Sequence, residues 1–386
     1  MAAAPPPIAE SQLQSWKVLA SFKERLAKAW PSIPPHPTWE DKQRKLQARD
    51  YLSLFLFGLL NPVVQTMRGL CAASHLARVQ QEVCSRSVSL GSFSEAQHLI
   101  GPAVLEKVFQ DLARELPGRD GSKRQWLIQD SSLFNALPRM HWALWRRQGT
   151  RQSQVRLHLS LSAADESPVR AQITAGRGCE RAAWERQARP GDAFIADRYY
   201  SENYSLLRRL DQTRVAFVVR LRETAVTRAL EELPCTPEDA KAQVIDDAWV
   251  ELGCKTRYKT GGLRLVRVNA EKEVLYLLTN LGPEELSARE VALLYKERWK
   301  VELFFRWIKY IMGCRHWLAE SAAGAEMELH LALIAGLLLH LRSGQRPNRR
   351  LMELLQFYTM GLASAEELEA GLLREKLRQE AGAKKS

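Results

Sequence analysis

The sequence predicts a mixed α/β protein with a helical N-terminal region, and three local patterns lead to this prediction. Apolar and polar residues alternate over 155–161, which is typical of a half-buried strand. The apolar run 193–196 has the length of a short buried strand. Between 105 and 116 the apolar residues instead recur at helical spacing, and Pro117 followed by Gly118 ends that helix.

Composition and charge limit the functional class. The chain has 386 residues, which at about 150 residues per domain predicts two to three domains. Its content of 46% hydrophobic and 26% charged residues is that of a globular protein and excludes a disordered or fibrous chain. Lys and Arg number 56 against 44 Asp and Glu, a formal charge of +12. This excess favours a polyanionic partner, nucleic acid before a membrane surface.

The cysteines and apolar runs predict a cytoplasmic location without a membrane segment. Six cysteines form no Cys-x-x-Cys pair, so free thiols in a reducing compartment are expected. The first residues lack the basic and apolar regions of a signal peptide. Two apolar runs, 51–60 and 329–341, are shorter than the about 20 residues needed to span a bilayer. Both are therefore predicted to be buried helices.

The N-terminal region, residues 1–120, is predicted to be mostly helical. Ser92 with Glu95 forms a capping box, the pattern that begins a helix. Pro102 starts the helix that carries the apolar stripe ending at Leu116. Two or three short helices fit between 63 and 99, where a helix-turn-helix for DNA binding is possible, although such clusters are more often packing units.

Residues 121–222 alternate between strand and helix patterns. The predicted order is three strands, a helix, a strand, a helix and a last strand: 125–130, 155–161, 168–174, 179–187, 193–196, 201–210 and 215–221. This order matches a ribonuclease-H-like domain with a mixed sheet and flanking helices. A β-rich insertion, 223–283, follows, and then a second part of the same domain, 284–345, with helices over 288–310 and 327–341. Residues 346–386 are predicted to be charged helices.

The segment 288–310 carries the most informative pattern of polar residues. On a helical wheel at about 100° per residue, four side chains share an arc of roughly 60°: Tyr295, Arg298, Glu302 and Lys309. Glu302 thus has two cations and a phenol as neighbours, whereas Glu297 falls inside the apolar arc. The alternative is ordinary Arg–Glu pairing four residues apart, which is common in helices.

Two aspartates lie where predicted buried strands end. Asp130 ends the strand 125–130, and Asp197 directly follows 193–196; each, taken singly, is equally typical of a turn. Gathered with Glu302, they would raise one another's pKa unless divalent cations lay between them. Mg²⁺ prefers carboxylate oxygens and leaves room for phosphate. Two such ions about 3.5–4 Å apart support in-line phosphoryl transfer.

The run from Tyr295 to Lys309 fits the pattern Y-x2-R-x3-E-x6-K. In this respect the chain resembles bacterial insertion-sequence transposases of the DDE type. The similarity extends to Ile128-Gln-Asp130-Ser-Ser-Leu-Phe and to Ile195-Ala-Asp197-Arg-Tyr-Tyr, where the first two catalytic aspartates of that family would fall. One departure is Tyr199, where many relatives have glycine.

The resemblance implies a metal-dependent enzyme that acts on double-stranded DNA. Asp130, Asp197 and Glu302 would hold two Mg²⁺ ions, for which Mn²⁺ can substitute. Cleavage at the terminal inverted repeats would pass through a DNA hairpin steadied by Tyr295, Arg298 and Lys309, before joining to target DNA. The N-terminal region would recognise the element ends, and the C-terminal helices would pair two protomers into a homodimer. The protein would be cytoplasmic and associated with the nucleoid.

The resemblance also implies that the insertion contacts DNA. Trp249 could stack on a base, although a tryptophan in a strand is more often part of the core. Lys255, Arg257 and Lys259 alternate and would face one side of a strand, either as a phosphate-contacting surface or as an ordinary solvated face.

Two other functions remain open at this stage. One is a nuclease or recombinase of the same fold that cleaves DNA without joining it. The other is a DNA-binding protein derived from an inactive transposase, against which the three intact acidic residues argue.

Overall fold

A computed structural model describes residues 17–34, 45–116, 124–147, 150–253, 262–314 and 316–383. The chain divides into two compact units. The first comprises 1–116, 133–155 and 306–386, and the second comprises 117–132 and 156–305. The strands β1 (Trp126–Asn135) and β3 (Thr150–Ser162) and the helix α13 (Trp299–Tyr310) contribute residues to both units.

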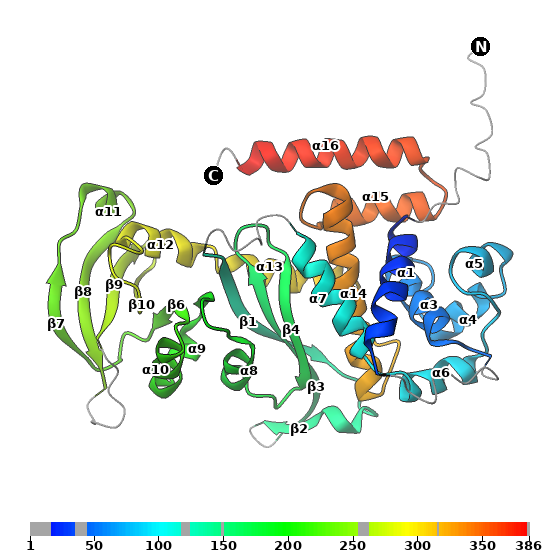
Figure 1. The fold of residues 1–386 in the computed structure, drawn as a ribbon, viewed down its shortest axis with the longest axis horizontal. Coiled ribbons are helices and arrows are strands. Elements are labelled where there is room, and N and C mark those ends of the chain that lie inside the picture. Colours follow the sequence, from blue (N-terminus) through cyan, green and yellow to red (C-terminus); the bar gives the residue numbers. More distant parts are fainter. Residues whose placement is uncertain are drawn as a thin grey trace, which may run out of the picture. The chain divides into compact units, whose positions relative to one another are not determined.

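The first unit is mainly helical within its described residues (Figure 1). Its elements are α1 (Lys17–Ala29), η1 (Trp30–Ser32), α3 (Ala48–Leu60), α4 (Met67–Ala73), α5 (Ala77–Glu82), α6 (Leu90–Leu99), α7 (Ala103–Glu115), η2 (His141–Ala143), β2 (Leu144–Arg147), α14 (Ala322–Ser343), α15 (Arg349–Thr359) and α16 (Ala365–Ala383). Side-chain oxygens cap several of these helices: Thr66 accepts from the Gly69 N–H and Ser89 from the Ser92 N–H. Such caps satisfy backbone donors that have no partner within a helix.

The central helix of this unit is α14. It packs against α1, α3, α6 and α7, and every residue of its segment 327–340 is buried. At 22 residues it is longer than the helix predicted over 327–341, so length and apolar composition alone would allow it to cross a membrane. Within the structure, 83% of its most apolar window is buried by other helices, as in the core of a globular protein.

A glutamate lies in the middle of this apolar helix. Glu328 has no exposed surface, and its carboxyl accepts a hydrogen bond of 2.9 Å from the Leu318 N–H. Burial raises the pKa of Glu328 to about 8, although hydrogen bonds from the backbone of Leu318 and Ala319 act in the opposite direction. The folded state therefore favours the neutral acid, and unfolding releases a proton near neutral pH.

Stability is expected to fall with rising pH because of Glu328. Its contribution is complete below the ordinary glutamate pKa and is lost as pH rises through the folded value of about 8. Between about pH 6 and about pH 9 the melting temperature of Glu328→Gln should therefore fall less than that of the wild type, by about 5 °C. Thermal melts of both proteins test this, and parallel curves would contradict it. This range avoids the titration of His330, whose pKa burial lowers to about 4.

The second unit combines a mixed sheet with helices, which confirms the predicted mixed α/β class. Besides parts of β1, β3 and α13, its elements are β4 (Pro168–Ala175), α8 (Glu180–Gln187), β5 (Ala193–Ala196), α9 (Arg198–Ser201), α10 (Tyr204–Gln212), β6 (Ala216–Leu221), β7 (Thr227–Leu233), α11 (Pro237–Lys241), β8 (Val244–Leu252), β9 (Leu263–Ala270), β10 (Glu273–Thr279) and α12 (Ala288–Lys296).

Within the part of the chain that the structure describes, ten strands form one sheet. Its main path runs β2–β3–β1–β5–β6–β10–β9–β8–β7, with β4 paired to β3. The strands β1, β5 and β6 are parallel neighbours, whereas β10 pairs antiparallel with β6. Strands of the segment 223–283 thus continue the same sheet through β10 (Figure 1).

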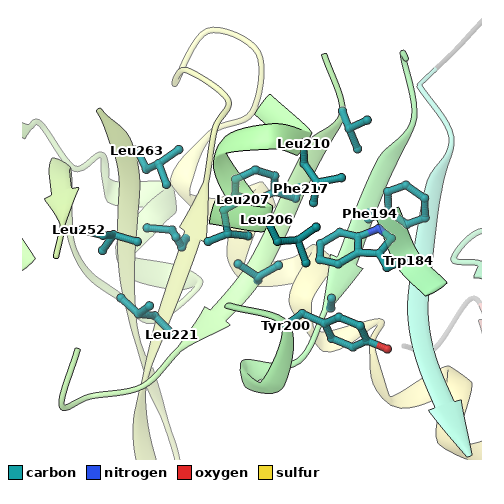
Figure 2. Close-up of a cluster of buried hydrophobic side chains, with 14 of the residues drawn as sticks. Trp184, Phe194, Tyr200, Leu206, Leu207, Leu210, Phe217, Leu221, Leu252 and Leu263 are labelled. Carbon is teal, nitrogen blue, oxygen red and sulfur yellow. The ribbon is translucent and has the colours of Figure 1, made fainter. Parts of the chain in front are cut away.

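A cluster of buried side chains supports the middle of this sheet (Figure 2). Trp184 of α8 meets Phe194 of β5 and Tyr200 of α9 edge to face, with centroid distances of 5.6 and 5.2 Å. Leucines of α10 and the strand residues Phe217 and Leu221 complete this part of the core. The core therefore anchors β1 through Leu127, β5 through Phe194 and α9 through Tyr200.

Candidate active site

Strand pairing brings Asp130 and Asp197 together. The parallel register pairs Gln129 of β1 with Ala196 of β5. Asp130 is the next residue of β1, and Asp197 directly follows the last residue of β5. The sequence predicts that the first strand ends at Asp130, but β1 continues to Asn135 and it is β5 that ends, at Ala196. Because β5 has only four residues, its pairing with β1 stops at Gln129, and β1 continues past Asp130 without β5 beside it.

Asp197 is held by the turn that follows its strand. It is the N-cap residue of α9, and its Oδ1 accepts a hydrogen bond of 2.9 Å from the Tyr199 N–H. The Asp130 carboxyl is oriented in a similar way, since its Oδ1 accepts a bond of 2.7 Å from the Ser131 N–H. One oxygen of each aspartate is thus fixed by the backbone.

Glu302 lies in the first turn of α13. The sequence predicts one helix over 288–310, but the structure has two, α12 and α13, separated at Glu297 and Arg298. Here the backbone N–H groups of Arg298 and Val301 donate to carbonyl oxygens three residues earlier, at Tyr295 and Arg298. This tighter turn interrupts the helix, so the continuous helical wheel over 295–302 is wrong.

Arg298 connects two of the three acids. Its Nη2 donates to Glu302 Oε1 at 2.8 Å, and its Nη1 lies 3.9 Å from Asp130 Oδ2. Arg298 also interacts electrostatically with Tyr295, a buried residue of α12. Burial raises the pKa of Tyr295, while the charge of Arg298 acts in the opposite direction. Of the four residues predicted to share one face, Tyr295, Arg298 and Glu302 thus form one connected group.

The charge of Asp130 is costly in this structure. Burial raises its pKa to about 7; the Ser131 N–H and Arg298 lower it, and the charges of Asp197 and Glu180 raise it further. Ionising this carboxyl group near neutral pH is unfavourable, because it is buried and lies among other acidic side chains. A bound cation would remove that cost.

The donor set fits a hard divalent cation. Asp130, Asp197 and Glu302 offer carboxylate oxygens, the ligands that Mg²⁺ and Mn²⁺ prefer. Among the described residues, however, no three His, Cys, Asp or Glu side chains are already grouped as a metal site. The guanidinium of Arg298 contacts both Asp130 and Glu302 and supplies the positive charge that these acids share in this arrangement.

Several residues near Asp130 were not predicted from the sequence as part of the site. Arg156 of β3 pairs with Glu180 of α8 and donates to Ser131 Oγ at 2.8 Å. Tyr200 is fully buried, and its hydroxyl has no hydrogen-bond partner among the described residues. Burial raises the pKa of Tyr200, and the charges of Asp130, Glu180 and Asp197 raise it further. Only the alternating pattern of β3 indicated that Arg156 faces one side of the sheet.

The remaining predicted residues are not part of this connected group as far as the structure describes them. Lys309 falls in the first compact unit, where its ammonium lies 5.1 Å from the centre of the Phe134 ring. Trp249 is half-buried in β8, and its role stays a prediction. Lys255, Arg257 and Lys259 lie outside the described residues. Glu297, expected inside an apolar arc, instead pairs with Lys300.

Two known proteins resemble parts of this chain in sequence. A protein of Sinorhizobium fredii (strain NBRC 101917 / NGR234), named as transposase y4zB, is 31% identical over 170 residues, which cover 43% of this chain and 46% of that protein. A protein of Geobacillus stearothermophilus, named as the transposase for insertion sequence element IS5377, is 27% identical over 205 residues, 52% of each chain. The chain thus spans about half the length of the curated relatives it matches.

A solved structure and a family model complete the comparison. The match to the structure of a piggyBac transposase synaptic complex with hairpin DNA covers 95% of this chain and 80% of that chain, at 10% identity and a TM-score of 0.42. The family model described as the transposase DDE domain matches residues 121–338, more than half of the chain, and includes Asp130, Asp197 and Glu302. The chain therefore belongs to the transposase DDE domain family.

Proposed function

We propose that this protein is a DNA transposase that cleaves the ends of its own insertion sequence and joins them to target DNA. The observation that carries the proposal is the placement of Asp130 and Asp197 at neighbouring strand positions, with Glu302 connected to Asp130 through Arg298. Their carboxylates would hold two Mg²⁺ ions. Ions so held would activate a water or a 3′-hydroxyl and stabilise the leaving oxygen.

The strand order supports the proposed ribonuclease-H-like core. In the order β4–β3–β1–β5–β6 the first strand in sequence is central and the parallel pair follows on one side. Acidic residues on adjacent parallel strands then meet at one edge, where rigid backbone fixes their spacing. The strands β7, β8 and β9 would be the inserted part.

The phosphate would be bound by the cationic and phenolic groups of the same site. Arg298 can hold two phosphate oxygens at once because its guanidinium presents paired donors. The Tyr295 hydroxyl, which interacts electrostatically with Arg298, would help to orient that guanidinium. Lys309 would contribute a further point charge. In this proposal the three residues steady a hairpin on the excised DNA end.

We propose roles for the remaining segments by analogy with the family. The N-terminal helices would recognise terminal inverted repeats, and α15 and α16 would join two protomers. Trp249, Lys255, Arg257 and Lys259 would contact DNA from the inserted segment. The protein would work in the cytoplasm, at the nucleoid.

The proposal is tested with purified protein and two kinds of duplex that carry the terminal repeats flanking its gene: uncut duplexes that keep adjoining DNA, for cleavage, and pre-cut duplexes, for joining. With Mg²⁺, nicked, hairpin and joined products are expected, and chelation by EDTA should remove all of them, because the three acids would lose the ions they hold. Reactions that contain Mn²⁺ in place of Mg²⁺ should form the same products.

Other outcomes identify the alternative functions. Cleaved DNA without joined products would reject transposition in favour of a nuclease. Specific DNA binding without any cleavage would indicate an inactive derivative. Cleavage that persists in EDTA would contradict the metal-dependent mechanism.

A further inference from the structure

An exposed aromatic ring lies beside the candidate active site. Tyr199 is the second residue after Asp197 and is 39% exposed, unlike the fully buried Tyr200 that follows it. Its backbone N–H donates to Asp197 Oδ1 at 2.9 Å. The position of the ring is therefore coupled directly to the position of an acidic residue of the site.

Arg181 of α8 holds this ring from one side. Its Cζ lies 4.1 Å from the ring centroid, a close cation–π contact. Its Nε and Nη2 donate to the Tyr199 carbonyl oxygen at 2.9 and 2.6 Å, and Nη2 also donates to Glu202 at 2.6 Å. The guanidinium is thus fixed by three hydrogen bonds, and the ring rests on a rigid base.

An aromatic neighbour, Tyr200, limits rotation of the ring. Tyr200 meets Tyr199 nearly perpendicularly, at 82° and a centroid distance of 5.9 Å. Arg181 covers one face and Tyr200 meets the ring at an angle, yet more than a third of the residue is still in contact with solvent. A ring that is held this firmly and left exposed is suited to stacking with a flat ligand.

We infer that Tyr199, backed by Arg181, is a stacking surface for a nucleobase of the DNA strand next to the cleaved phosphate. The inference rests on the proposed function, because Asp197 places the ring beside the acids that would act on that phosphate. Every base has a π-face, so the contact needs no particular sequence and favours an unpaired base at a DNA end. The exposed Arg198, between Asp197 and Tyr199, adds positive charge for the backbone of the same strand.

The test measures stacking separately from catalysis. The probe is a duplex with a short single-stranded end, in which 2-aminopurine replaces one base at a time around the cleavage position. Binding is measured in Ca²⁺ by fluorescence quenching of the probe. For wild type, strong quenching is expected at one or two adjacent positions. Tyr199→Ala and Tyr199→Leu should lose this quenching and bind about tenfold more weakly, whereas Tyr199→Phe should behave like the wild type.

Matched variants separate stacking from loss of exposed apolar surface. Leu293 of α12 is 41% exposed, so Leu293→Ala removes a similar surface without an aromatic ring and should bind like the wild type. Arg181→Met should weaken quenching less than Tyr199→Ala, because it leaves the ring in place without its cation. Tyr199→Leu keeps much of the side-chain volume without the ring. It therefore controls for a folding defect in Tyr199→Ala.

Three results would overturn the inference. Tyr199→Ala and Tyr199→Leu could quench and bind as the wild type does, Leu293→Ala could lose as much binding, or the wild type could fail to bind DNA, which would also end the proposed function. If the wild type binds and shows Tyr199-dependent quenching but never cleaves, stacking stands and the transposase proposal fails.

Discussion

Replacing Glu302 by glutamine is expected to lower DNA cleavage and strand transfer about a thousandfold or more, with little change in DNA binding. The amide oxygen of glutamine can still accept the hydrogen bond that Arg298 donates to Glu302. The local geometry is therefore kept while the negative charge that would hold a metal ion is lost. Gel assays of product formation, with filter binding or anisotropy for affinity, measure both quantities.

Glu297 provides the matched control for this prediction. It is also a glutamate, at the junction of the same two helices, but it pairs with Lys300 and not with the acids of the site. Glu297→Gln should keep cleavage within about twofold of the wild type, since surface ion pairs contribute little to structure. Loss of activity in Glu297→Gln with activity retained in Glu302→Gln would show that Glu297, and not Glu302, is the third acidic residue of the site.

Asp130→Asn should separate activity from stability. Burial raises the pKa of this carboxyl to about 7, so its charge is unfavourable in the folded protein without a cation. The neutral amide is expected to abolish cleavage while the melting temperature stays equal to the wild-type value or rises. A purely structural role for Asp130 predicts the opposite, a lower melting temperature.

The second large effect is expected at a buried ion pair in the segment 223–283. Arg264 is fully buried, and its Nε donates to both oxygens of Asp247 at 2.8 and 3.0 Å. It also donates to the carbonyl of Leu286, next to the cap of α12. Arg264→Met should lower the free energy of unfolding by about 3–5 kcal/mol, because Asp247 is left charged and unpaired inside the protein. Urea denaturation measures this change.

A neighbouring pair on the same strands is the control. Arg267 of β9 pairs with Asp246 of β8, but both side chains are more than a third exposed. Arg267→Met should therefore cost less than about 1 kcal/mol. The double change Arg264→Met with Asp247→Leu should recover most of the lost stability, since it leaves no unpaired charge. Equal losses in the two single variants would show that burial does not decide the effect.

Local patterns were enough to predict the fold class and the candidate residues. The alternation in 155–161 and the apolar run at 193–196 correspond to β3 and β5, because side-chain periodicity follows directly from backbone geometry. The spacing of Tyr295, Arg298 and Glu302 was also visible in the sequence. Membership of the transposase DDE domain family confirms the family that the resemblance predicted.

Contacts between distant residues could not be predicted in this way. The break between α12 and α13 depends on hydrogen bonds within one tight turn, which the helical wheel does not contain. The pairing of β10 with β6 joins the segment 223–283 to the central sheet, and no periodicity signals that register. The same holds for Arg156, Glu180 and Tyr200, which burial and charge, rather than spacing, place near Asp130.

The sequence by itself determined which residues can form strands and helices and which side chains are candidates for the chemistry, since these are properties of short segments. Only the tertiary structure decided that Asp130 and Asp197 take adjacent positions across β1 and β5, and that Arg298 shares its charge between Asp130 and Glu302. Strand register and charge pairing depend on the free energy of packing segments far apart in the chain. Because these contacts join distant segments, they produce no local periodicity in the sequence.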